Sequence, residues 1–516
     1  MAHTMKKQNF FLLAIFACVF FSCASVIPGV TEITAYEKTE NPKTIKKKKY
    51  KAEKFLKALD AGDLEKATAF LLGEKKTTKE EIRQFLNLAL AEHFLKSFET
   101  SIQHFASVDE RMFVRETKSI SAETASLLLN ENLSAYEGRS YEKFYMHVFN
   151  ALNYYQLGNL EDALVEMRKL VLVQKEFEKL YGSATNEKAI VSRTINEADV
   201  MASMLGINLV ALKEKIPQSL PNENRFRDSA LSRYASMIFF DMYNDSNARV
   251  DAKRLKILSP DFDVENEFAN ESDFENGNGL LSVLSFSGLI ARREEETFYF
   301  PGDVVNGLAG LAVSVLGFGP SAMIVLPPFE NDIVVPAFRI KFAYPKFPTE
   351  KNKTNVEKIV ACVLETGDEE ELSLVENLSL TVKKDVMQAA PTEFARSIVR
   401  SILKKGTAVT AGVAALAAIK KNSDESFWTE ISYAASYLSL VIALEAIDAG
   451  ETADIRQCVV LPEKACAKTL HLAPGSYTVA VSYYGENNAL LYTETFYNQK
   501  IEAGKRLLLE STFLRK

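Results

Sequence analysis

The sequence predicts an α+β protein, in which an N-terminal all-α solenoid of helix pairs is followed by a β-rich α+β C-terminal domain. Two observations predict this division. Apolar residues recur at spacings of three and four from about residue 50 to 260, which is typical of amphipathic helices. From about residue 280, apolar and polar residues alternate in short runs instead, which is typical of strands.

Composition limits the number of domains and the classes of partner. The chain has 516 residues, of which 47% are hydrophobic, so it is long enough for two to four domains with their own cores. Its net charge of −7 does not favour nucleic acid as a partner. Five cysteines and five histidines are too few and too scattered for a metal site or a disulfide framework, so we expect no metal and no cofactor.

The first 22 residues carry the features of a signal peptide. Two lysines precede an apolar run from Phe10 to Phe21, which is shorter than the roughly 20 residues that a membrane span needs. Ser22 and Cys23 follow. This pattern resembles the lipobox of bacterial lipoproteins, in the loose form found in spirochaetes, which implies cleavage before Cys23 and a diacylglycerol on its thiol. The alternatives are lipidation at Cys18, a soluble secreted chain, or an uncleaved anchor.

Residues 23–49 are predicted to be a lipidated tether. Proline and glycine at positions 28, 29 and 42 argue against a continuous helix, and four lysines stand in a row at 46–49. These lysines either contact anionic lipid or belong to a solvated spacer. The lipobox resemblance places the protein in the bacterial cell envelope, anchored by lipid to the periplasmic or surface face of the outer membrane.

The clearest repeat lies between Tyr141 and Glu176. Its first helix places apolar residues on one stripe, Gly158 ends that helix because glycine tolerates a left-handed turn, and a second amphipathic helix follows. The unit resembles a tetratricopeptide (TPR) repeat, in which a small residue lets the paired helices approach closely. The features that match the TPR pattern are Ala151, Tyr154, Gly158 and Ala163.

Weaker copies of this unit occur at residues 54–72, 82–106 and 229–260. Together the four units predict a TPR-like helical domain over residues 50–260, because no repeat of a solenoid buries its apolar face without its neighbours. An irregular helical bundle is the alternative.

Solenoid domains present a concave face, and most of them bind protein segments there. Aromatic residues cluster around the best repeat and are candidates for such a face, although the same side chains could belong to the core. The candidate partner-binding residues are Tyr136, Gly138, Tyr141, Phe144, Tyr145 and Tyr154.

The acidic, turn-rich stretch 261–279 predicts a linker, and residues 280–516 predict the α+β domain. Segments 280–301 and 333–347 are expected to contain strands, and the last strands are expected to form a β-meander. Between them, two uncharged runs of 14 residues, 406–419 and 431–444, predict a helical hairpin over about 392–448. We expect this hairpin to be buried against the sheet, with a partner or lipid surface as the alternative.

A further uncharged run extends from Val304 to Phe329. Its length would allow a membrane span, but glycines and prolines interrupt it, so we expect a buried segment, with membrane contact or a span as alternatives. Cys362 is expected to be buried and free. Cys458 and Cys466 flank a short turn and could form a disulfide in an oxidising envelope.

Several elements, in order along the chain, resemble a family of uncharacterised bacterial envelope lipoproteins with TPR-like repeats. The elements are AYEGRSYE (135–142), with Ala135 in place of the family's proline, GLIARR (288–293), FARSIVRSILKK (394–405), ADIRQCVVLP (453–462), with Cys458 in place of an aromatic residue, and LAPGSYTV (472–479). The resemblance implies an envelope lipoprotein of no established activity, often encoded near other envelope-assembly lipoproteins. The candidate residues of its C-terminal motifs are Arg293, Asp454 and Arg456.

No nucleophile elbow, phosphate-binding loop or zinc-protease motif occurs in the sequence. Asp454 and Arg456 could form a site, but an internal salt bridge is the favoured interpretation. We therefore expect a non-enzymatic, membrane-anchored scaffold that binds envelope proteins through its helical domain. The alternatives are a cell-wall enzyme, or an activator of one, acting through the C-terminal domain, and a pore- or transport-associated component.

Overall fold

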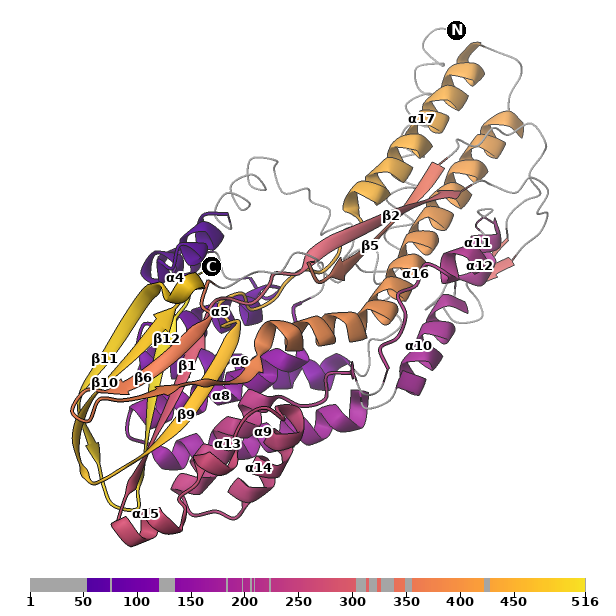
Figure 1. Cartoon of the computed structure of the whole chain (residues 1–516). Coiled ribbons are helices and arrows are strands. Elements are labelled where there is room, and N and C mark those ends of the chain that lie inside the picture. Colours follow the sequence, from indigo (N-terminus) through magenta and orange to yellow (C-terminus); the bar gives the residue numbers. More distant parts are fainter. Residues whose placement is uncertain are drawn as a thin grey trace.

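The computed structural model is a mixed α+β structure whose N-terminal region is mostly helical and whose C-terminal region combines several sheets with two long helices (Figure 1). This confirms the predicted division between the two halves of the chain. The structure describes residues 53–74, 77–119, 135–181, 184–196, 198–204, 207, 209–221, 224–302, 312–314, 323–325, 338–348, 355–421 and 427–515. The signal peptide, Cys23 and the tether lie outside the described residues.

The uncharged run 304–329 also lies mostly outside them. Within it the structure describes only β3 (Ala312–Ser314) and β4 (Met323–Val325), which pair with each other in antiparallel fashion.

Helix pairs form a helical layer, stacked in chain order. Helix α4 contacts α5, α6 contacts α8, and α9 contacts α13. The pairs are residues 53–60 with α4 (Leu64–Leu72), α5 (Glu81–Phe94) with α6 (Phe98–Ser119), α8 (Ser140–Gln156) with α9 (Leu160–Tyr181), and α13 (Ala230–Met242) with α14 (Asn247–Leu258).

Each of these pairs turns through a residue with a positive φ angle, and the predicted break at Gly158 is confirmed. The turn residues are Gly62, Lys96, Gly158 and Asn244, with φ angles of 74°, 61°, 78° and 55°. At Gly158, two backbone bonds close the first helix: the N–H of Gly158 donates to Tyr155, and that of Asn159 donates to Tyr154. Bonds of the same spacing occur in the other three turns. A small, buried residue follows each turn: Ala67, Ser101, Ala163 and Ala248.

Two four-stranded sheets pack face to face beside the helical layer. The central sheet has the strand order β12-β1-β9-β8, in which β1 and β12 are parallel and the other pairs antiparallel. The outer sheet has the antiparallel order β11-β10-β6-β7. The strands are β1 (Gly279–Ser287), β6 (Lys358–Val363), β7 (Asp368–Glu371), β8 (Ser373–Asn377), β9 (Lys464–Leu472), β10 (Gly475–Tyr484), β11 (Leu490–Ile501) and β12 (Arg506–Phe513).

Strand β1 is buried on both faces because the central sheet lies between two layers. Leu281 and Val283 point into the core between the sheets, whereas Leu284 and Phe286 join the core shared with the helices. All nine residues of β1 are buried. The helical layer and the C-terminal region therefore share one hydrophobic core, in which residues from α5, α8 and α13 contact residues from β1, α16 and the segment before β9.

The predicted linker at 261–279 is instead a packed part of the structure. It contains a 3-10 turn, η3 (Glu265–Glu267), and the short helix α15 (Glu271–Asn276). Glu267 accepts a 2.5 Å bond from the Thr469 hydroxyl, and Asp273 lies 2.5 Å from the ring of His471. Both acids are buried, because strand β9 supplies the polar partners that an isolated acidic stretch lacks.

The predicted C-terminal meander is also wrong. Strands β10 and β11 pair as a hairpin, but β9 and β12 belong to the central sheet, where each pairs with β1. The segment 451–463, which precedes β9, has no regular secondary structure. Alternation predicts that a segment is a strand but does not determine its partner, so strands that follow one another can lie in different sheets.

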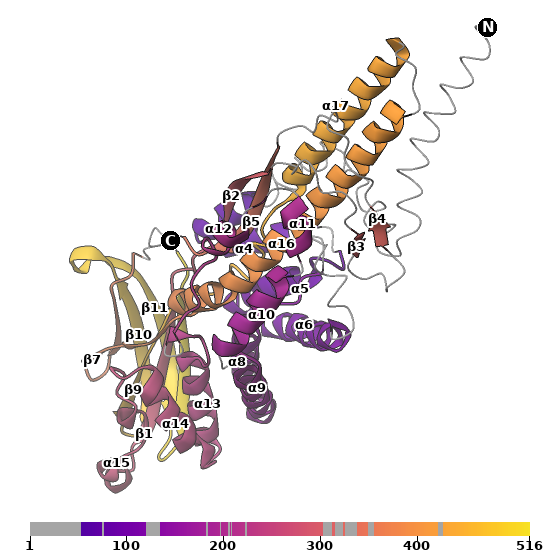
Figure 2. The same ribbon diagram turned by 90° about the vertical axis from the view of Figure 1, so that its right-hand side faces the viewer.

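Helices α16 (Leu378–Lys421) and α17 (Phe427–Gly450) form an arm that projects from the layers (Figures 1 and 2). The base of the arm packs on the two-stranded sheet of β2 (Glu294–Gly302) and β5 (Phe338–Lys346). Arg400 Nε donates a 3.0 Å bond to Glu451, and Lys405 pairs with Asp448 at 2.8 Å. Three short helices also pack in this core: α10 (Ala184–Asn196), α11 (Asp199–Met204) and α12 (Leu209–Lys213).

The hairpin predicted over 392–448 is thus present but begins earlier and is buried only at its base. Towards its tip, side chains such as Ile431, Leu438 and Ile442 are exposed, so the expectation of a hairpin buried along its length is wrong. By length and composition, both α16 and α17 could cross a membrane.

Candidate functional site

Three of the sequence elements quoted above, 135–142, 288–293 and 453–462, meet at one place in the fold, beside helix α16. The segment before α8, the segment after β1, helix α16 and the segment before β9 all contribute charged side chains to it. We call this cluster the charged junction and define it as Tyr136, Arg139, Glu142, Arg293, Asp385, Glu393, Asp454 and Arg456.

Glu142 ties the start of α8 to the C-terminal region. As the third residue of the helix, it reaches back and accepts a 2.7 Å bond from the backbone N–H of Arg139, which satisfies a donor that the helix leaves free. It also accepts bonds from the Tyr136 hydroxyl, at 2.7 Å, and from the backbone N–H of Cys458, at 2.5 Å. Burial raises the pKa of Glu142, and these three bonds partly offset that effect.

Glu393 of α16 lies between two arginines that come from distant parts of the chain. Arg139 donates to it at 2.9 Å and Arg293 at 3.2 Å. Arg293 is 4% exposed, and its Nε and Nη1 atoms have no hydrogen-bond partner within the part of the chain that the structure describes. Glu393 therefore supplies one carboxylate shared by two buried guanidinium groups at the centre of the junction.

Asp454 and Arg456 form the internal ion pair that the sequence favoured. Arg456 donates from Nε and Nη2 to the two carboxylate oxygens of Asp454, both at 2.8 Å. Burial opposes ionisation of Asp454, but the bonds from Arg456 and the charge of Arg139 lower its pKa overall. Arg456 also lies 3.3 Å from Glu80 and stacks on the Tyr136 ring, so the pair joins α5 to the segment before β9.

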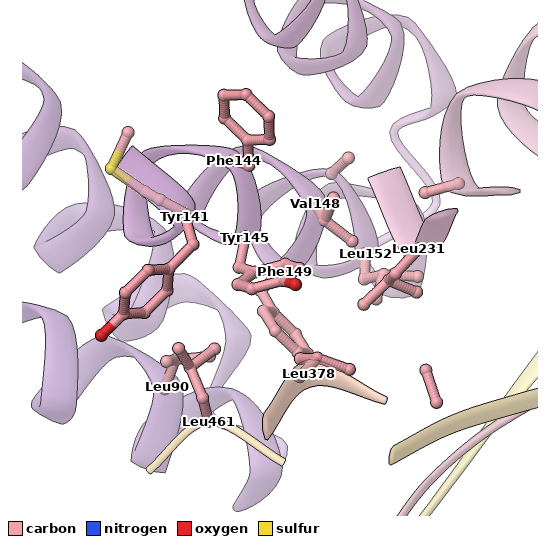
Figure 3. Close-up of a cluster of buried hydrophobic side chains, with 14 of the residues drawn as sticks. Leu90, Tyr141, Phe144, Tyr145, Val148, Phe149, Leu152, Leu231, Leu378 and Leu461 are labelled. Carbon is pink, nitrogen blue, oxygen red and sulfur yellow. The ribbon is translucent and has the colours of Figure 1, made fainter. Parts of the chain in front are cut away.

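The six candidate partner-binding residues lie around α8. Tyr136 belongs to the charged junction, and the other aromatic residues follow along the helix. Tyr141, Phe144 and Tyr145 are fully buried, and Tyr154 is half-buried. The Tyr145 hydroxyl donates to Glu376 at 3.0 Å. Figure 3 shows α8 side chains directed towards Leu90, Leu231, Leu378 and Leu461, which come from both halves of the chain.

The aromatic side chains considered for a partner-binding face thus belong to the core, where they pack on other helices and on the chain's own C-terminal region. Buried side chains do not contact a partner in this conformation. Instead, they contribute to the core that joins the helical layer to the central sheet.

Gly138 has a φ angle of +84°, and a Cβ there would lie 2.2 Å from the Met112 methyl group. We expect Gly138→Ala to lower the free energy of unfolding by about 1–3 kcal/mol, through both backbone strain and this contact. Gly158→Ala is the matched control, since its φ of +78° is similar but nothing lies within 4 Å of the added Cβ. Urea denaturation should show the larger loss for Gly138→Ala, and equal losses would contradict the predicted contact.

Asp385 is buried beside Arg139, Arg293 and Glu393, and burial raises its pKa from 3.8 to about 6. A raised pKa means that the folded state binds this proton more tightly than the unfolded state does. Stability should therefore fall as pH rises from about 4 to about 6, by about 2–3 kcal/mol from this group. Asp385→Asn should remove that loss.

Urea denaturation of both proteins between pH 4 and pH 8 checks this prediction. The stability of Asp385→Asn relative to the natural chain should increase through that window and then stay constant. A difference that is the same at every pH would contradict it.

Sequence reasoning missed four residues of the junction: Arg139, Glu142, Asp385 and Glu393. Glu142 had a local signal, because glutamate at the third position of a helix is typical of a capping box. Glu393 had none, since its two arginine partners are 254 and 100 residues away along the chain.

The disulfide considered between Cys458 and Cys466 is not formed, and both thiols are free. Burial raises the pKa of each, to about 12 for Cys466.

The residues of the charged junction do not line the best-formed cavity of the described structure. A pocket of about 450 Å³ lies elsewhere, lined by residues that include Lys358, Glu371 and Lys464. Among the described residues, no cluster of histidine, cysteine and carboxylate side chains could hold a metal ion.

The chain matches no family model, no curated protein and no solved structure.

Proposed function

We propose that this protein is a lipid-anchored scaffold of the bacterial cell envelope, without catalytic activity, whose helical layer is a TPR-like solenoid that holds a protein partner. The repeated turn geometry supports the solenoid. The same backbone bonds and a small residue after each turn recur in all four helix pairs, as expected of repeats that stack on their neighbours.

The charged junction supports a mechanical role for the family motifs. Its acids and arginines bond to one another and join α5, α8 and α16 to the segment before β9. Such pairing holds the helical layer and the sheets in one orientation. A scaffold needs this property in order to hold a partner at a defined place relative to its anchor.

The observation that carries the proposal is a set of exposed aliphatic side chains on the outer helices. Val165 and Leu172 of α9 are 43% and 61% exposed, and Val250 and Ile257 of α14 are 55% and 72% exposed. Each pair is seven residues apart and therefore lies on one face of its helix. Helix α13 contacts both α9 and α14. We infer that the partner binds these second helices, because the chain's own sheet covers the other side.

Photo-crosslinking in cells tests this proposal. A photoreactive amino acid at Leu172, and separately at Ile257, should give the same discrete adduct with one envelope protein. The control position is Tyr497, which is 70% exposed but lies on the outer sheet, and it should not give that adduct. Different adducts at the two helical positions, or no adduct at either, would contradict the proposal. Turnover of cell-wall material by the purified chain would favour an enzyme instead.

The lipid anchor is tested by labelling cells with an alkyne analogue of palmitate. Cys23→Ala should abolish incorporation of the label into the protein, because the thiol that carries the diacylglycerol is gone. Cys18→Ala is the matched control and should keep the label. Loss of label in the Cys18→Ala variant alone would move the site to that residue. Absence of label from the natural chain as well would remove the anchor from the proposal.

A further inference from the structure

The distal part of the α16–α17 arm is an exposed apolar hairpin. We propose that this hairpin, residues 406–419 of α16 with residues 431–444 of α17, inserts into the hydrocarbon of a lipid bilayer. This would be a second membrane attachment, separate from the lipid on Cys23 and independent of the scaffold role.

Between Glu430 and Glu445, the exposed face of α17 carries no charged residue, unlike that of a helix that faces water. The buried residues of this helix are Ser436, Leu440, Leu444 and Asp448, which form a single stripe with a spacing of four towards α16. Other side chains face outwards in the described structure, and Leu438 and Ile442 among them are 58% and 60% exposed. Since amphipathic helices of soluble proteins place charged residues on the exposed face, an uncharged exposed face indicates an apolar environment.

Both helices have their uncharged runs at matching heights in the hairpin. Each run has 14 residues, which corresponds to about 21 Å of helix. The hydrocarbon core of a bilayer is about 30 Å thick, so the hairpin would enter most of its depth, and Lys420 and Lys421 at the tip can extend their side chains towards the headgroups. Because both helices carry such a run, insertion of the whole hairpin into the hydrocarbon accounts for the pattern better than contact of one helix face with the membrane surface.

The groups at the two ends of the hairpin agree with this orientation. At the base, the buried Lys405–Asp448 pair fixes the arm to the rest of the protein. At the tip, Lys420 and Lys421 end α16, and Phe427 and Trp428 begin α17. Lysine and tryptophan are enriched where membrane helices meet the headgroup region.

The contact between the helices also has the form found in membranes. Gly412 of α16 packs against Leu440 of α17, and a Cβ at residue 412 would lie 2.7 Å from the nearest methyl carbon of Leu440. Small residues at such contacts let helices approach closely where no hydrophobic effect drives them together. The hairpin can thus hold its own shape while its outer surface remains available to lipid.

Trp428 is the only tryptophan of the chain, so its fluorescence reports on the tip of the hairpin alone. The test uses the full chain with Cys23→Ala, which carries no acyl group. Vesicles of phosphatidylcholine and phosphatidylglycerol should shift the emission to shorter wavelength. Vesicles made with acyl-brominated phosphatidylcholine should quench about half of the emission or more, because the bromine atoms lie in the hydrocarbon that the hairpin enters.

Two leucines with nearly equal exposure provide matched variants. Leu438→Glu places a charge in the hairpin, at a side chain that is 58% exposed, and should reduce the quenching by about fivefold or more. Leu490→Glu makes the same change on β11, at a side chain that is 60% exposed, and should leave the quenching unchanged.

Three results would overturn the proposal. The first is an emission spectrum that vesicles do not change. The second is a shift without quenching by brominated lipid, which would mean contact with the surface only. The third is a shift that depends on protein concentration in the absence of vesicles, which would mean that a second copy of the chain covers the hairpin.

Discussion

Glu393→Ala should lower the free energy of unfolding by about 3–5 kcal/mol, because it leaves the guanidinium groups of Arg139 and Arg293 buried without their shared carboxylate. The Arg293 side chain is 1% exposed, so bulk solvent does not solvate its charge in the folded protein. The loss should be visible as a lower urea midpoint. The same variant should also expose the segments that meet at the junction to proteolysis.

Glu371→Ala is the control for this change, since it removes a glutamate from an exposed pair with Lys358. Exposed pairs contribute little because water already solvates both charges, so the control should change the free energy of unfolding by about 0.5 kcal/mol or less. A Glu393→Ala loss as small as that of the control would mean that the junction does not hold the layers together.

Phe286→Ala should cost about 3–5 kcal/mol, through lost burial and the cavity that it leaves. Phe286 lies on β1, is fully buried, and has its ring centroid 5.1 Å from that of Phe149 and 6.1 Å from that of Phe94. These contacts join the central sheet to α5 and α8. The variant should therefore loosen the helical layer from the sheet as well as lower the urea midpoint.

Hydrogen exchange measures where that loosening occurs. Protection should fall in both β1 and α8, since the two share one core. Phe274→Ala removes a ring that is 74% exposed and should leave the exchange pattern unchanged. Loss of protection confined to β1 would instead support two separate domains with a weak interface.

The helix pairs were predictable because their signals are local. Gly158 and Ala163 sit at the turn and at the close contact of the same pair, within a few residues of each other. The aromatic residues of α8 were harder to interpret. A buried stripe and a groove-lining stripe have the same spacing in sequence. The pattern therefore could not show that Phe144 packs on Phe177 and Phe226, or that the chain's own C-terminal region covers Tyr141.

The acidic stretch 261–279 shows the same limit in another form. Its composition predicts exposure, yet Glu267 and Asp273 are buried because Thr469 and His471 bond to them from β9. These partners lie about two hundred residues further along the chain. The cost of burying a carboxylate depends on such partners, and a local window of sequence does not contain them.

Strand β1 has consequences for how the chain folds as it is synthesised. Its two neighbours, β9 and β12, come from residues 464–513, close to the end of the chain. A protein that is synthesised from its N-terminus therefore completes its helical layer long before the strands that cover that layer exist. Until then, an apolar helical surface has no partner in the chain and needs protection from aggregation. The last strands thus determine when the first half of the molecule can finish folding.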